Sequence, residues 1–485
     1  MIGISAWDYV FIRTCILVLH LVAPLSVLYS LVSWLLHLPF HIPRVLEIWL
    51  ALEAVFYLLV YLPRRTYLQA VVAHPAGGRD DRRRLFWRCH INIPDPERYL
   101  KRWFRDAPTA EIKRENVKDF FRWAFLHSGE PDPAYDEELE EYVEEMEKLL
   151  GRKLEPGLGN AQSLRLTLDK VEMLHRSLTW YLCVFIVDTL ASIYLRYYSF
   201  SFYRTSLFRF LAVFPTRLLT LFSTYRSPAR TLTYWYRPHT SRTRLPVLFI
   251  HGIGVGLYPY IPFLADLNTI DGEDLSDGQV GIIAIEILPI SSRITAEALL
   301  KDEMCDEVHC ILKEHGWESY GSVVATHLLH TPRIAGKIGP ILFVDPVSFL
   351  LHLPDLAYNF LWRKPTLPSE YLLSYFGSKD MGVAHTLFRR FIWSDNALWK
   401  EDVQGHHVAV VLAGKDVIVD TKVIGAYLTG ADYWPPDTGT WENGVWKGDG
   451  LDVLWLQELD HGEAFSRRRT RKRLVDIVMR FVAES

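Results

Sequence analysis

The chain has 485 residues, of which 49% are hydrophobic, 13% aromatic and 23% charged, and its formal net charge is −4. This composition excludes a disordered protein, and it favours a globular chain of two or three structural parts with some membrane-facing surface. The small net charge gives no indication of a nucleic-acid partner. The five cysteines form no CxxC pair, so we expect reduced thiols facing the cytosol, and neither a disulfide framework nor a zinc cluster.

The amino-terminal part of the chain contains two apolar runs. Residues 14–36 carry no charged side chain, and about twenty apolar residues suffice to cross a bilayer. Residues 45–62 form the second run, but they include Glu47 and Glu53, which are costly in hydrocarbon. The second run is therefore a second span, the return arm of a hairpin or a helix at the membrane interface. For both runs the alternative is a helix buried in a protein core.

Arginines follow the two apolar runs. Arg64 and Arg65 end the second run, and residues 82–84 are three more arginines. Under the positive-inside rule these cations place the rest of the chain on the cytosolic side. Residues 1–65 are thus predicted to be a membrane segment with one or two transmembrane helices.

Residues 66–230 are predicted to form a helical region that is partly associated with the membrane. The acidic stretch 135–150 has apolar residues at helical spacing, which is typical of a helix with one solvated face. Residues 180–202 are apolar and aromatic but contain Asp188 and Arg196. A third transmembrane span and a buried core helix are both compatible with that pattern.

The next stretch, residues 207–222, spaces arginines among phenylalanine and leucine. This pattern suits a helix that lies in a membrane interface, with its cations near the lipid headgroups. We therefore expect this stretch to pack against the carboxyl-terminal part of the chain or to attach that part to lipid.

From residue 231 onward, short apolar runs alternate with helical patterns. The expected strands are 232–236, 245–250, 280–287, 338–344, 407–413 and 452–459, and the expected helices include 295–315 and a basic helix at 467–483. Such alternation predicts an α/β domain with a mainly parallel sheet covered on both faces. Open sheets of this kind place their functional residues at the carboxyl ends of the strands.

Four short motifs follow one another along this domain. His251-Gly252-Ile253-Gly254 directly follows an apolar strand, and Ser319-Tyr320-Gly321 stands before a helical pattern. Asp416 and His461 follow the last two expected strands. This order resembles the α/β-hydrolase superfamily, whose triad partners follow the sequence serine, acid, histidine. The resemblance covers residues 231–485, roughly half of the chain.

The resemblance implies a role for each motif. Ser319 would be the nucleophile, His461 the general base and Asp416 the acid that orients the imidazole. Backbone N–H groups near Gly252, Ile253 and Tyr320 would form the oxyanion hole. Asp345 also follows an expected strand and is the alternative acid. No metal or organic cofactor is implied.

The sequence departs from the family pattern just before the serine. The expected helix ends near Gly316, so only Trp317 and Glu318 precede Ser319. The family requires a central apolar strand there, with a small residue two positions before the nucleophile. We therefore expect either that the sheet lacks this strand or that residues 316–320 are recruited in its place. Ser322 is an alternative nucleophile, but it has Tyr320 two positions before it and Val324 two positions after it.

Residues 347–405 are rich in aromatic side chains and occupy the position of the family's helical cap. An aromatic lid beside a membrane predicts an apolar acyl substrate, although ordinary helix packing explains the same pattern. The sequence as a whole predicts a membrane-anchored serine hydrolase of lipase or carboxylesterase type. Its partners would be membrane lipid and an apolar ester. The alternative is an inactive α/β-hydrolase-like scaffold on a membrane, because the strand before Ser319 is not evident.

Overall fold

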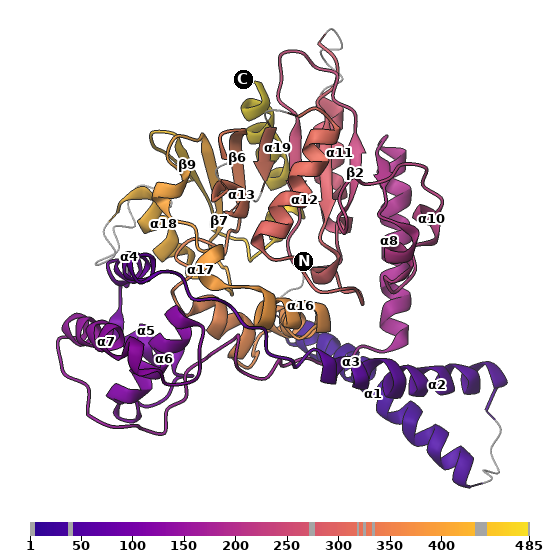
Figure 1. Cartoon of the computed structure of the whole chain (residues 1–485). Coiled ribbons are helices and arrows are strands. Elements are labelled where there is room, and N and C mark those ends of the chain that lie inside the picture. Colours follow the sequence, from indigo (N-terminus) through magenta and orange to yellow (C-terminus); the bar gives the residue numbers. More distant parts are fainter. Residues whose placement is uncertain are drawn as a thin grey trace.

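The computed structural model describes residues 5–36, 42–270, 277–317, 320–323, 326–331, 335–431 and 444–483. Within this part, the chain forms one large sheet with helices on both faces, a separate helical lobe, and long apolar helices near the amino terminus (Figure 1). The sheet contains nine strands in the order β1-β2-β4-β3-β5-β6-β7-β9-β8.

The strands come from residues 201–456. Their bounds are β1 Ser201–Tyr203, β2 Thr233–Arg237, β3 Val247–Ile250, β4 Ile282–Glu286, β5 Tyr320–Val323, β6 Ile338–Val344, β7 Val408–Ala413, β8 Val445–Lys447 and β9 Leu451–Leu456. Strands β4, β3, β5, β6, β7 and β9 pair in parallel, whereas β1, β2 and β8 pair antiparallel at the two ends of the sheet. Every residue of β4, β7 and β9 is buried, as expected where helices cover both faces of a parallel sheet.

Five helices cover the two faces of the sheet. Helices α12 (Lys301–Glu314), α13 (Thr326–Leu329) and α18 (Thr421–Thr429) share one hydrophobic core, and α11 (Ile261–Ile270) and α19 (Arg468–Ala483) share the other. The predicted α/β architecture with a mainly parallel sheet is therefore confirmed. Its parallel strands bring the loops after β3, β6, β7 and β9 to one edge.

Strand β5 differs from the sequence-based expectation. The central position between β3 and β6 is filled, and it is filled by Tyr320–Val323 rather than by residues 316–320. The expectation of an empty central position is therefore wrong, and the helical pattern expected after Gly321 is described as a helix only from Thr326. The physical reason is that β3 and β6 both need a backbone partner, and the residues after Trp317 supply the nearest one.

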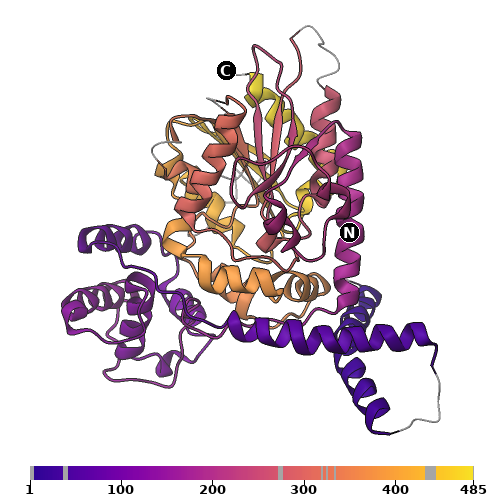
Figure 2. The same ribbon diagram turned by 45° about the vertical axis from the view of Figure 1, so that its right-hand side comes forward.

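The predicted cap lies beneath the sheet and next to the amino-terminal helices (Figures 1 and 2). Its helices are η7 Leu356–Trp362, α15 Pro368–Leu372, η8 Leu373–Ser378, α16 Met381–His385, η9 Thr386–Arg390, α17 Trp393–Asn396 and η10 Lys400–Val403. Helix α1 reaches this cap, because the Tyr9 and Tyr371 rings lie 5.7 Å apart and the Arg13 guanidinium lies 4.5 Å from the Tyr371 ring centroid.

The helical lobe has its own aromatic core. It consists mainly of α4 Arg79–His90, α5 Pro96–Trp103, α6 Arg114–Leu126 and α7 Asp136–Leu150. The Phe86 and Tyr142 rings stack at 4.1 Å in its centre. The lobe docks on the cap through hydrogen bonds such as Trp393 Nε1–H to the Ala124 carbonyl (2.8 Å) and Trp103 Nε1–H to the His352 carbonyl (3.2 Å).

Three helices are long and apolar enough to cross a membrane in the described part of the chain. Helix α1 (Ala6–Leu35) has a mean hydropathy of 2.3 over its best window. A continuous helix over Arg44–Tyr67, made of α2 (Arg44–Phe56), η1 (Tyr57–Tyr61) and α3 (Leu62–Tyr67), reaches 2.0. The third, α8 (Leu178–Tyr197), reaches 1.7 and stands beside the β1–β2 end of the sheet in Figure 1.

The carboxylate of Glu53, on α2, is fully buried at the amino terminus of α8. It accepts hydrogen bonds from Leu178 N (2.7 Å), Thr179 N (2.8 Å) and the Thr179 hydroxyl (2.8 Å). A helix amino terminus has free N–H donors and a partial positive charge, so it stabilises an anion there. The free-energy cost of burying this glutamate in an apolar run is thus offset by its hydrogen bonds to the amino terminus of α8.

Two charged residues of the 180–222 stretch, Asp188 and Arg217, form buried ion pairs. Asp188 on α8 pairs with Arg217 (2.9 Å) and Arg293 (2.5 Å). Arg217 binds Glu286 with two hydrogen bonds of 2.7 and 2.8 Å. The expected single helix over residues 207–222 is instead two short helices, with Arg217 in this buried cluster between them. These helices are α9 (Leu207–Leu211) and α10 (Leu218–Leu221).

Candidate active site

The loops at the carboxyl edge of the sheet bring three predicted site features together. Asp416 follows β7, His461 follows β9, and Gly252 and Ile253 follow β3. Asp345, the alternative acid, follows β6 between them in the strand order. The carboxylates of Asp345 and Asp416 are fixed by backbone N–H donors of these loops.

Asp416 and His461 form a direct pair. His461 Nδ1 lies 2.7 Å from Asp416 Oδ2. The other carboxylate oxygen of Asp416 accepts from Ile418 N (2.8 Å) and Val419 N (3.1 Å), and the carboxylate has no exposed surface. Because the carboxylate is locked by its own loop, it fixes the imidazole orientation and leaves Nε2 on the far side of the ring.

The charge environment of His461 favours its protonated form. Burial lowers the pKa of the imidazole, but the Asp416 carboxylate, with two further aspartates, outweighs burial and raises the pKa to about 9. The side chain retains 22% of its surface exposed. The negative charge of the aspartates therefore holds the His461 ring, and the exposed part of the ring can contact a molecule that enters from solvent.

Asp345 lies beside this pair but holds backbone groups, not the imidazole. Its carboxylate accepts from Ala413 N (3.0 Å) and Gly462 N (2.8 Å), and so it ties the loops after β7 and β9 together. Burial raises the pKa of Asp345 to about 6, against the opposing effect of His461. Its φ of 47° lies in the left-handed region, which an aspartate tolerates at a modest energetic cost.

The neighbour of His461 has a similar supporting contact. Asp460 is partly buried, and its carboxylate accepts from His461 N (2.7 Å) and Val417 N (3.2 Å). Sequence reasoning missed these supporting contacts of Asp345 and Asp460 because they depend on which backbone N–H groups the folded loops present. The position of Asp345 directly after a strand was the only signal.

The loop after β3 is held by its histidine. His251 is 2% exposed, its Nε2 accepts from Ile287 N at 3.0 Å, and its Nδ1 lies 2.7 Å from the Gly252 carbonyl oxygen. This pattern requires a neutral ring with the proton on Nδ1. Burial lowers the pKa of His251, in agreement with that state. Gly252 and Ile253 are exposed at the carboxyl edge, whereas Gly254 N already donates to the Ile290 carbonyl at 3.1 Å.

Tyr320, the third residue predicted for the oxyanion hole, is not brought to this edge. Ser319 lies outside the described residues. Tyr320 is the first residue of β5 and pairs with Ile338, the first residue of β6. Its backbone therefore lies at the amino end of the parallel strands, opposite Asp416 and His461. Ser322 pairs with Leu248 within the sheet.

Within the described residues, no group of three or more His, Cys, Asp or Glu side chains is arranged to hold a metal ion. Cys305 and Cys310, which bracket His309 in the sequence, are both on α12, where Cys305 is buried and Cys310 is exposed.

Neither a family model nor a curated protein matches the sequence. Many solved structures match it at low similarity. A membrane phospholipase A, described as a bacterial virulence factor, is 10% identical, with a TM-score of 0.37 over 63% of this chain and 94% of its own. A putative lipase from Acinetobacter baumannii is 11% identical, with a TM-score of 0.34 over 52% and 90%. Alpha/beta hydrolase domain-containing protein 10 from mouse is 13% identical, with a TM-score of 0.33 over 52% and 95%.

Identities and TM-scores this low carry no argument about activity. The architecture itself is a mainly parallel sheet with helices on both faces and loops gathered at its carboxyl edge. The chain thus has a mixed α/β fold with a mainly parallel sheet, and solved α/β-hydrolases align with about half of its length at low similarity.

Proposed function

We propose that this chain is a membrane-anchored serine hydrolase of lipase or carboxylesterase type, acting on an ester with an apolar acyl group. The observation that carries the proposal is the 2.7 Å contact between His461 Nδ1 and Asp416 Oδ2 at the carboxyl edge of the sheet. A buried carboxylate that orients an imidazole is the arrangement that activates a hydroxyl nucleophile.

In the proposed reaction, the Ser319 oxygen attacks the ester carbonyl carbon while the neutral form of the His461 imidazole takes the hydroxyl proton at Nε2. The raised pKa of about 9 makes this neutral form the minor one at pH 7. The imidazolium then gives this proton to the alcohol oxygen as the C–O bond breaks. A water molecule attacks the acyl-serine in the same way and releases the carboxylic acid. Backbone N–H groups near Gly252 and Ile253 supply the oxyanion hole in this scheme.

A second candidate function is a catalytically impaired α/β-hydrolase-like scaffold on a membrane. The observation that favours it is the placement of β5, which uses Tyr320–Val323 as the central strand. Only Val324 and Ala325 then separate β5 from α13. Neither residue carries a nucleophile at the strand-to-helix turn, where the proposed reaction requires one.

A fluorophosphonate probe separates the two functions, because it reacts covalently with an activated serine. For the hydrolase, we expect labelling of the wild-type chain that is lost in Ser319→Ala and kept in the matched variant Ser322→Ala. Cooperative unfolding would show that the chain is folded. If such a folded chain is not labelled, the result would favour the scaffold. Labelling that is lost only in Ser322→Ala would refute the assignment of Ser319.

We also propose that α1 and the Arg44–Tyr67 helix anchor the chain in a membrane, with the hydrolase domain on the cytosolic side. Their length and hydropathy support membrane insertion. Arg65 and the arginines at 82–84 support the orientation through the positive-inside rule. A protease-protection assay on sealed microsomes tests it. A domain that is digested without detergent fits the proposed orientation, and a protected domain contradicts it.

A further inference from the structure

The start of helix α19 carries a dense group of basic side chains. Six of the seven residues at 467–473 are arginine or lysine, in a chain whose formal net charge is −4. Two of the six pair with acids of the fold. Arg467 lies 3.5 Å from Glu463, and Arg471 lies 2.6 Å from Asp266.

The other four basic residues form no ion pair within the part of the chain that the structure describes. These four, called the α19 cations below, are Arg468, Arg469, Lys472 and Arg473. All but Arg473 are exposed. Arg468 and Arg469 open the helix, where the helix dipole disfavours positive charge, and each has a second cation four residues later, which repels it. This arrangement costs stability in the isolated chain, and an anionic surface against it would remove the cost.

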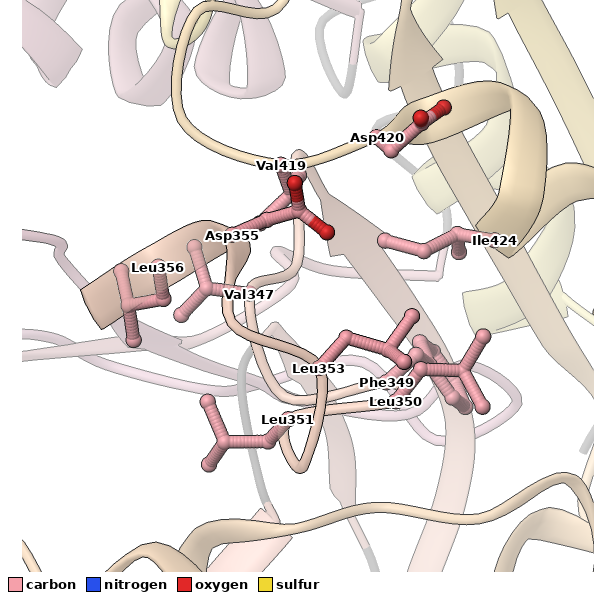
Figure 3. Close-up of a pocket in the computed structure, with 10 residues that line it drawn as sticks. All are labelled: Val347, Phe349, Leu350, Leu351, Leu353, Asp355, Leu356, Val419, Asp420 and Ile424. Atoms are coloured by element: carbon pink, nitrogen blue, oxygen red, sulfur yellow. The ribbon is translucent and has the colours of Figure 1, made fainter. Parts of the chain in front are cut away.

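The basic helix α5 of the lobe shows the contrast. Its Arg98 lies 3.3 Å from Asp420, and its Arg102 lies 3.1 Å from Asp355. Figure 3 shows these two acids among the side chains that line a small, mostly apolar pocket. The cations of α5 thus dock the lobe on the rest of the protein, whereas the α19 cations have no such internal use.

The α19 cations lie near both the loop of His461 and helix α8. Between His461 and α19 the chain forms the short helix η11 (Glu463–Phe465), and the Phe465 ring lies 4.9 Å from the ring of Tyr260. Tyr260 belongs to η4 (Tyr258–Tyr260), which in turn contacts α8. Tyr258 is exposed there, and tyrosine is common where a protein surface meets the boundary of membrane and water.

Helices α8 and α19 also lie on the same side of the sheet, since Leu195 of α8 and Val478 of α19 belong to one hydrophobic core. The outward side chains Leu182 and Ile186 of α8 are 57% and 50% exposed. Apolar and basic side chains on neighbouring helices are the combination that binds an anionic membrane surface. The apolar part favours a membrane over a nucleic acid, whose non-specific binding rests on charge alone.

We propose that the α19 cations bind the anionic headgroups of the membrane in which the chain is anchored. This contact goes beyond the proposed anchor and does not require hydrolase activity. It brings the loop of His461, which directly precedes α19, to the membrane surface. Because the attraction is electrostatic, it depends on anionic lipid and weakens with salt.

The test measures how fast a cysteine beside the α19 cations reacts with a water-soluble maleimide. The reporter is Ser466→Cys, at an exposed position, in a full-length chain whose exposed Cys15, Cys183 and Cys310 are serines. The chain is placed in nanodiscs of phosphatidylcholine, with or without about 30% phosphatidylserine. With phosphatidylserine we expect the reaction to be about fivefold slower at about 50 mM salt, and equally fast in both nanodiscs at about 0.5 M salt.

Charge reversal at the three exposed α19 cations should abolish the slowing by phosphatidylserine. The matched control reverses three exposed cations elsewhere, which are Arg230, Arg242 and Lys447, and it should keep the slowing. Glutamine at the three α19 positions adds no acid to the helix start, so this variant should lose the slowing even if the glutamate variant fails to fold. Equal rates for the wild-type cations in the two nanodiscs would overturn the proposal, as would slowing that survives in the glutamine variant.

Flotation with liposomes separates this contact from the proposed anchor. If the anchor holds, the wild-type chain and the charge-reversed chain both float with phosphatidylcholine alone, and the maleimide rates alone decide the proposal. A chain that floats only when phosphatidylserine is present, and only with its α19 cations intact, would refute the anchor and support the contact of α19.

Discussion

The contact between Asp416 and His461 joins two loops that are 45 residues apart in the sequence. Both residues could be predicted, because chemistry-bearing side chains directly after apolar strands gather at one edge of a parallel sheet. The supporting contacts of Asp345 could not be predicted from the sequence, since they involve N–H groups of Ala413 and Gly462 that only the folded loops bring together.

The pair also links stability to pH, and the sign follows from the raised pKa of His461. The protonated imidazole is stabilised in the folded state, so the contribution is complete below the unfolded-state pKa of about 6.5. It is then lost as the pH rises through about 9.

We expect Asp416→Asn to lower the free energy of unfolding by about 1–2 kcal/mol at pH 6 and by much less above pH 9. Urea unfolding at both pH values measures this, with the exposed Asp449→Asn as control. A pH-independent loss would contradict the assignment.

At the scale of elements, strands β2, β3, β4, β6, β7 and β9 follow from local sequence, but the central strand β5 and the edge strands β1 and β8 do not. Strands β4, β6, β7 and β9 lie within apolar runs, and α12 buries Cys305, Val308, Ile311 and Leu312 at helical spacing. Strand β5 forms from Tyr-Gly-Ser-Val, which has no such pattern. Its position depends on the need of β3 and β6, on either side, for a backbone partner. The local sequence of residues 320–323 gives no sign of that tertiary requirement.

An inserted strand should therefore change both folding and reactivity. We expect that about six apolar, β-branched residues placed between Glu318 and Ser319 replace Tyr320–Val323 in the sheet and move Ser319 to the carboxyl edge. Fluorophosphonate labelling and the yield of soluble hydrolase domain should both rise. A Gly/Ser insertion of equal length is the control, because it adds chain but no strand propensity. If the two insertions gave equal labelling, the missing-strand hypothesis would be wrong.

A second element-scale feature is the attachment of α2 to α8 by Glu53. Three donors at the α8 amino terminus point at one buried carboxylate, so removal of that carboxylate leaves them without a partner. We expect Glu53→Ala to lower the stability of the chain in detergent by about 2–3 kcal/mol. Glu47→Ala, on the same helix at an exposed position, should change stability by no more than about 0.5 kcal/mol. Equal thermal shifts for the two variants would contradict the capping role.

At the scale of the whole molecule, α8, α9 and α10 share an exposed apolar surface. Asp188 of α8 and Arg217, directly before α10, point inward to the buried cluster, whereas Arg196 of α8 is exposed. The outward side chains Leu182, Ile186, Phe208, Leu218 and Phe222 are between 50% and 86% exposed. An apolar surface of this size on a chain with two further apolar helices suits contact with lipid.

The lipid contact can be measured at Phe222, which is 85% exposed. In a background in which the exposed Cys15, Cys183 and Cys310 are serines, Phe222→Cys should react with a water-soluble maleimide about tenfold more slowly in liposomes than in detergent. Val445→Cys, on β8 at the opposite end of the sheet, should react equally in both. A Phe222→Cys rate that liposomes do not slow would place this surface in water.

The position of Glu53 has a consequence for how the chain is made. Its partner Leu178 lies 125 residues further along, so the ribosome completes α2 long before the peptide groups that bind this carboxylate exist. A helix that left the translocon during that interval would carry an unpartnered acid into lipid. Stable insertion of the proposed anchor would therefore depend on synthesis of the following region. A chain truncated before residue 178 would present an incomplete membrane segment to the quality-control machinery of the cell.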